Sequence, residues 1–208
     1  MSYDFILGKL PYAPEDIFVD AASSWGIRGL YGENYFMIPS SDLTRFRRLF
    51  EECSNKDLMD IPCKKLPIAY LKLLTAMVSV LCFSGLCRGR IVRLNCDNTN
   101  AVTWLQKSRC PARIGFRMLS VIELCKHKIQ LKVSTHHIPG VAKISADSLS
   151  RGYTPAWIRK FGKKCHINLD NVADLMVNPL PLFRKVLLGR FFWVVFRDFF
   201  LLKTVCPQ

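Results

Sequence analysis

The chain has 208 residues, which is enough for one domain with an extension or for two small domains. Half of its residues are hydrophobic, and this content excludes wholesale disorder. Thirty Lys and Arg oppose sixteen Asp and Glu, and the net charge of +14 favours a polyanionic partner. Nucleic acid is the first candidate and an acidic membrane surface the second, while the plainer alternative is a solvated basic surface.

The cysteines and the hydrophobic segments indicate an intracellular protein, cytoplasmic or nuclear. The nine cysteines are scattered and include no C-x-x-C pair, so their spacing favours reduced, buried thiols over a zinc site. The N-terminal residues do not have the pattern of a signal peptide. The most membrane-like segment, residues 186–202, is a poor candidate for a span because it contains charged residues: Arg190, Arg197 and Asp198.

The first half of the chain predicts a hairpin followed by helices. A short buried strand is expected over residues 17–19, and a second strand over residues 31–38, with a third strand near this hairpin as an open alternative. Residues 39–65 are polar and predict a short helix and a loop. Pro67 then opens a helix that continues to Phe83.

The second half alternates strands and helices. The pattern predicts a strand over residues 90–96 and a helix over 101–107, which Asn98 or Thr99 would cap. It then predicts a helix over residues 112–127, a strand over 129–133 and a short helix over 142–149. This order is typical of a mixed α/β domain, placed at residues 15–152, and residues 153–208 form a basic, aromatic-rich C-terminal extension.

Three aspartates occupy positions that metal chemistry favours. Asp20 and Asp97 each follow a predicted strand, and Asp147 lies on the short helix after Pro139 and Gly140. Carboxylates that converge at strand ends can hold hard divalent cations. Two such ions about 3.5–4 Å apart promote phosphodiester hydrolysis. Taken singly, each aspartate is better explained as a turn residue, a helix cap or a solvated side chain, because these are common uses of Asp.

Four short segments resemble the ribonuclease H domains of retroelements, most closely those of tyrosine-recombinase (DIRS-type) elements. They are residues 19–27 (VDAASSWGI), 94–102 (LNCDNTNAV), 136–140 (HHIPG) and 146–151 (ADSLSR). The resemblance covers about residues 15–152. It implies a ribonuclease H-like mixed sheet flanked by helices, with a C-terminal helical extension here. It also implies Mg or Mn as the metal and an RNA–DNA hybrid as the substrate.

The resemblance assigns roles to individual residues, and the chain departs from the family at Ala22, Lys143 and, most importantly, at a metal ligand. Asp20, Asp97 and Asp147 match three metal-binding carboxylates of the family, and His137 matches its catalytic-loop histidine, with a merely solvated histidine as the alternative. The second metal-binding Glu of the family falls at Lys72. An ammonium repels a cation, so we expect Lys72 to pair with Asp20 or Asp97 in the place of the metal.

Two asparagines beside Asp97 and four basic residues around the turn between two predicted helices are candidates for nucleic-acid contacts. A solvated helix face is an equally good explanation of them. The candidates are Asn98, Asn100, Lys107, Arg109, Arg113 and Arg117.

The sequence therefore predicts a retroelement-derived, ribonuclease H-like domain that binds nucleic acid and has weak or no nuclease activity. Three alternatives stay open. The first is slow hydrolysis of hybrids through metal held by the three aspartates. The second is a non-catalytic module that binds nucleic acid or protein. The third is a decayed fragment of an element.

Overall fold

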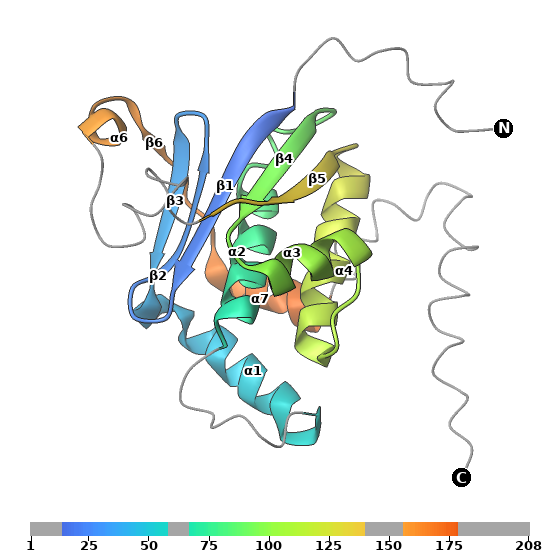
Figure 1. Cartoon of the computed structure of the whole chain (residues 1–208). Helices are drawn as coiled ribbons and strands as arrows, with labels where there is room; N and C mark the ends of the chain where they lie inside the picture. Colours follow the sequence, from blue (N-terminus) through green and yellow to red (C-terminus); the bar gives the residue numbers. More distant parts are fainter. Residues whose placement is uncertain (1–13, 58–66, 140–155, 179–208) are drawn as a thin grey trace, which may run out of the picture.

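Six strands form a mixed sheet that is flanked by helices (Figure 1). The computed structural model describes residues 14–57, 67–139 and 156–178. In the sheet order β5-β4-β1-β2-β3-β6, β1, β2 and β3 are antiparallel neighbours, and the other pairs are parallel. The prediction of a mixed α/β architecture is confirmed. The strands are β1 (Glu15–Ala22), β2 (Gly26–Tyr31), β3 (Asn34–Pro39), β4 (Ile91–Cys96), β5 (Lys132–His137) and β6 (Lys163–Lys164).

The N-terminal region forms three antiparallel strands, and the third strand that the sequence left open is present. The bounds 31–38 expected for the second strand were wrong, because the chain turns between Tyr31 and Asn34, which pair with each other across β2 and β3. Gly32 in that turn has a φ of +56°, a conformation that glycine adopts without steric cost. Gly26 opens β2 at a φ of +116°, and a Cβ there would lie 2.0 Å from the Ile38 carbonyl oxygen. The turn and the tight pairing both depend on glycine.

Within the described residues, the predicted helices are present with small shifts at their ends. A 3-10 turn, η2 (Ser40–Leu43), leads into the first of them. Pro67 immediately precedes the second, as its preference for helix starts predicts. The helices are α1 (Thr44–Asp57), α2 (Ile68–Cys82), α3 (Thr99–Lys107), α4 (Arg113–Lys128), α6 (Ala156–Phe161) and α7 (Leu169–Val177).

The last predicted strand lies further along the chain than expected. A strand over residues 129–133 was wrong, because Ile129 still donates its backbone N–H to Cys125 at the end of α4. Gln130 follows with a φ of +55°, and the strand runs instead over Lys132–His137. The apolar residues 129, 131 and 133 suggested a strand period, but the first two close the helix. The shift moves His137 to the carboxyl end of a strand.

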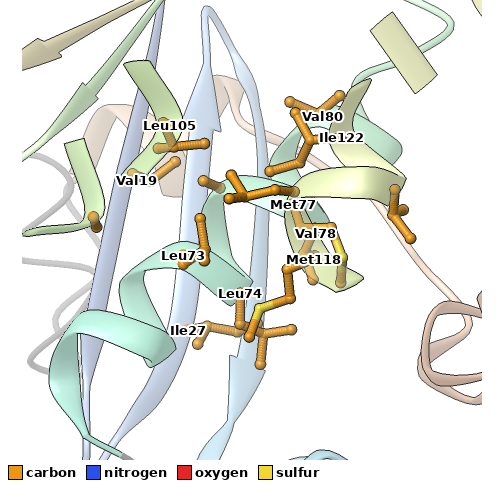
Figure 2. Packing of buried hydrophobic residues seen from close by; sticks show 14 of the residues in the cluster. Val19, Ile27, Leu73, Leu74, Met77, Val78, Val80, Leu105, Met118 and Ile122 are labelled. Atoms are coloured by element: carbon orange, nitrogen blue, oxygen red, sulfur yellow. The ribbon is translucent and has the colours of Figure 1, made fainter. Parts of the chain in front are cut away.

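Helix α2 forms the centre of the main core. All its residues from Ala69 to Val80 are buried, and Figure 2 shows its side chains packed between strand residues and those of α4. The hydroxyls of Thr75 and Ser79 donate to carbonyl oxygens one turn earlier, at 2.7 and 2.8 Å, so they are satisfied inside the helix. A Cβ at Gly29 would lie 2.7 Å from Ser79 Oγ, so the helix approaches the sheet closely there. A helix that is buried on all sides makes any charged residue in it notable.

Part of the expected C-terminal extension packs against this same body. Strand β6 adds to the sheet edge beside β3, and α7 places Val172 and Met176 in the main core. Ile158 of α6 packs with Leu30 in a second, smaller cluster. The short helix predicted over residues 142–149 lies outside the described residues, as does segment 186–202. Within the described ranges, no helix has the length and apolar character needed to cross a membrane.

Candidate active site at the ends of two parallel strands

Asp20 and Asp97 lie where two neighbouring parallel strands stop pairing. Strands β1 and β4 pair over Glu15–Phe18 and Val92–Asn95. Asp20 lies on β1 beyond this paired segment, and Asp97 directly follows β4. The carboxyl ends of adjacent parallel strands lie at the same edge of a sheet, so two residues far apart in sequence become neighbours. This juxtaposition is the core of the predicted carboxylate site.

The Lys72 ammonium joins the two carboxylates. Its Nζ donates a hydrogen bond to Asp20 Oδ1 and lies 2.8 Å from Asp97 Oδ1. The side chains of Lys72 and Asp20 are each 6% exposed, whereas that of Asp97 is 24% exposed. A single cation from α2 therefore bridges the ends of β1 and β4 inside the protein.

The charge of Lys72 depends on these two partners. Burial opposes the ammonium and by itself lowers the pKa of Lys72, but the interactions with Asp20 and then Asp97 outweigh it. The net result is a pKa of Lys72 above its ordinary value. The side chain is therefore a stable cation at neutral pH. The Lys72 ammonium occupies the position in which a metal ion would contact both carboxylates.

Arg28 is a further buried charge at this site, and the sequence interpretation missed it. It lies on β2 directly opposite Asp20 in the β1–β2 register and is 4% exposed. Burial lowers the pKa of Arg28 while Asp20 raises it, and the lowering is the larger effect. One signal could have identified Arg28: it is a charged residue inside a short, otherwise apolar strand of a hairpin whose other strand carries Asp20.

His137 and two asparagines surround Asp97. The His137 ring Nε2 lies 3.2 Å from the backbone oxygen of Asp97, at the exposed end of β5. Asn98 caps α3, because its side-chain oxygen accepts a hydrogen bond from the Ala101 backbone N–H at 2.9 Å. The predicted capping role of Asn98 is thus observed. Asn100 is exposed in the first turn of the same helix. His137 thus reaches Asp97 from β5, whereas Asn98 and Asn100 follow Asp97 directly in the chain.

The predicted basic residues line the connection between α3 and α4. Lys107 ends α3 and Arg113 begins α4, with Arg109 between them, and all three are exposed. Arg117, one turn further along α4, is only partly exposed. This group is a basic surface separate from the buried carboxylates, and we call Lys107, Arg109 and Arg113 the α3–α4 basic turn.

The described part of the site does not fit a divalent metal ion. Asp20 and Asp97 offer the oxygen ligands that Mg or Mn prefers, but the Lys72 ammonium contacts both of them. Among residues 14–57, 67–139 and 156–178, no group of three or more His, Cys, Asp or Glu is placed to hold a metal ion. Asp147, the third predicted ligand, lies outside the described residues. The described chain thus shows an internal cation between the two carboxylates.

The site thus consists of two carboxylates, Asp20 and Asp97, with the buried cations Lys72 and Arg28 beside Asp20. No protein-family model, curated protein or solved structure matches this chain.

Proposed function

We propose that this chain is a ribonuclease H-like, nucleic-acid-binding domain of retroelement descent in which nuclease activity is weak or lost. The observation that carries the proposal is the contact of the Lys72 ammonium with both Asp20 and Asp97. The resemblance in sequence puts a metal-binding Glu at position 72. If a metal site had been converted into a salt bridge, a lysine in contact with both carboxylates would be expected at this position.

The arrangement of the fold supports the proposal at a coarser level. A mixed sheet flanked by helices is the architecture that the resemblance implies, with Asp20 on β1 and Asp97 directly after the adjacent strand β4. His137, the match to the family's loop histidine, lies beside Asp97. Three residues that the sequence motifs single out thus lie around one edge of the sheet.

The proposed partner is an RNA–DNA hybrid, bound through its phosphates and sugars. The net charge of +14 favours a polyanion, and the α3–α4 basic turn presents three exposed cations. Contacts between basic side chains and phosphates need no metal, and hybrid-like duplexes are recognised largely through backbone and 2′-hydroxyl groups. Binding can therefore persist after the metal site is lost. We place this activity in the cytoplasm or nucleus, consistent with the cysteine pattern.

Hydrolysis, in contrast, depends on bound divalent ions, and this site lacks the carboxylate at position 72 that would help to hold them. Two-metal cleavage needs ligands that balance two divalent ions, and replacing a carboxylate by an ammonium changes the site by two charge units in the opposing direction. Electrostatic stabilisation by preorganised charges is usually the largest contribution to catalysis, so its loss lowers the rate by several powers of ten. The chain should bind hybrid without cleaving it.

The test measures binding and cleavage of one labelled hybrid by the 208-residue chain. We expect hybrid to bind in EDTA without any divalent metal, and no cleavage product in Mg²⁺ or Mn²⁺. Lys72→Glu should bind Mn²⁺ more tightly than the wild type and gain cleavage, and Lys72→Glu combined with Asp97→Asn should lose both again. Cleavage by the wild type at an ordinary enzymatic rate, or a folded chain that does not bind hybrid, would show that the proposal is wrong.

A further inference from the structure

Arg28 brings a second positive charge to the same carboxylate that Lys72 contacts. Residues directly opposite each other in an antiparallel pair project from the same face of the sheet with closely spaced Cβ atoms. Arg28 and Asp20 form such a pair, and both residues are almost fully buried, at 4% exposure each. Asp20 therefore has a buried ammonium in contact and a buried guanidinium across the strand pair.

The guanidinium of Arg28 is incompletely satisfied. Its Nε and Nη1 are buried and have no hydrogen-bond partner within the part of the chain that the structure describes. Arginine stays protonated in proteins, so its charge persists despite burial. A buried donor without an acceptor is costly. The buried positive charge of Arg28, across the strand pair from Asp20, disfavours a divalent cation next to Asp20.

The charge balance of the site depends on the residue at position 72. In the wild type, two carboxylates (Asp20 and Asp97) face two cations (Lys72 and Arg28), and the four formal charges cancel. Lys72→Glu leaves three carboxylates facing one guanidinium that has unused donors. Adding Arg28→Met leaves three carboxylates alone, which is the arrangement suited to a hard cation.

We propose that Arg28 is a specificity-determining residue of this site, a second built-in cation that excludes divalent metal ions together with Lys72. The inference rests on the proposed function, because it takes Asp20 and Asp97 to be former metal ligands. Lys72 explains why a metal is displaced from between the carboxylates. Because Arg28 remains, we expect that restoring the carboxylate at position 72 restores only part of the metal affinity.

Mn²⁺ alone is the probe, and its dissociation constant is measured by calorimetry and by electron paramagnetic resonance. The variants are the wild type, Arg28→Met, Lys72→Glu and the double variant Lys72→Glu/Arg28→Met. We expect no site-bound Mn²⁺ in the first two, weak binding to Lys72→Glu, and at least tenfold tighter binding to the double variant. Circular dichroism and thermal melts establish that each variant is folded.

Two controls separate the local charge of Arg28 from net charge and from packing. Lys72→Glu/Arg48→Met carries the same net charge as the double variant, but Arg48 is exposed on α1, so its affinity should equal that of Lys72→Glu. Lys72→Glu/Arg28→Lys keeps the local cation and should also remain weak. If Arg28→Met does not fold, Arg28→Gln removes the charge with a polar side chain, and its comparison with Arg28→Lys decides the same question.

The outcomes distinguish the inference from the function on which it rests. Equal Mn²⁺ affinity of Lys72→Glu and the double variant would overturn the role of Arg28 and leave the former metal site intact. Folded variants that all fail to bind Mn²⁺ would overturn both. A gain that Arg48→Met reproduces would show that net charge, and not Arg28, controls the affinity.

Discussion

The ammonium of Lys72 on α2 lies 2.8 Å from a carboxylate oxygen of Asp97, which directly follows β4. The same ammonium donates to Asp20 on β1. Three elements far apart in sequence are thus held together by one buried cation. A buried ion pair of this kind contributes little net stability compared with apolar residues, yet removing one partner leaves an uncompensated charge. The site is therefore sensitive to any substitution that changes only one of its members.

Removing the Lys72 charge should destabilise the protein strongly. Lys72→Met keeps the length of the side chain but leaves Asp20 and Asp97 without their shared cation, and we expect a loss of about 3–5 kcal/mol in the free energy of unfolding at pH 7. Urea denaturation measures it. Lys72→Met/Asp20→Asn removes one of the two stranded charges and should recover part of the loss. A loss below about 1 kcal/mol for Lys72→Met would mean that the pair contributes no more than an exposed salt bridge.

Alkaline pH should destabilise the fold through its buried thiols. Burial is the main cause that raises the pKa of Cys87 and of Cys125 from 9.0 to about 11. Because these pKa values are higher in the folded state, the stability that they contribute is complete below pH 9 and is lost as the pH rises towards 11. Each thiol lowers the free energy of unfolding by at most about 1.4 kcal/mol per pH unit in this window.

The ammonium of Lys72 acts in the same direction at the upper end of this range. Its pKa is raised in the folded state, so its contribution is complete below the ordinary lysine pKa and is lost as the pH rises through the raised value. Urea denaturation between pH 8 and pH 11 measures the combined slope. Cys87→Ala/Cys125→Ala should flatten it between pH 9 and 11, and an unchanged slope would contradict the assignment to these thiols.

Substitution at Asn98 separates helix capping from nucleic-acid binding. Its side chain accepts the Ala101 backbone N–H, so Asn98→Ala should cost about 0.5–2 kcal/mol of stability, whereas Asn98→Ser keeps the cap and should cost little. Thermal melts measure this cost, and hybrid affinity is measured in parallel. Asn100→Ala, at an exposed position of the same helix, is the matched control. A stable Asn98→Ala variant that loses hybrid affinity would assign Asn98 to the nucleic acid instead.

The α3–α4 basic turn should carry part of the salt dependence of binding. The affinity for hybrid should fall as salt rises, because each phosphate contact releases condensed counterions with a log–log slope of about 0.9 per contact on B-form duplex. Replacing Lys107, Arg109 and Arg113 together by Gln should weaken binding and reduce this slope. Replacing three exposed cations elsewhere makes the same change in net charge and should leave the slope nearly unchanged; they are Arg48, Arg88 and Lys128. Equal slopes for the two triple variants would exclude the α3–α4 basic turn as the contact surface.

Local chemistry allowed most secondary structure to be predicted from the sequence. The apolar run after Pro67 predicted α2, and the cap at Asn98 predicted the start of α3, because both depend on neighbouring residues only. The position of β5 was predicted wrongly for a related reason. Apolar residues that close a helix, such as Ile129, have the same period as a strand, and only the hydrogen bond to Cys125 decides between them.

The candidate site was also predictable only in part. The sequence by itself singled out Asp20, Asp97 and the lysine at position 72, because each is recognised from the residues next to it in the chain. Only the tertiary structure decided that Lys72 bridges both carboxylates and that Arg28 lies opposite Asp20. The physical reason is that a charge interaction depends on distance and burial, and both are determined by how β1, β2, β4 and α2 pack together, not by the order of residues along the chain.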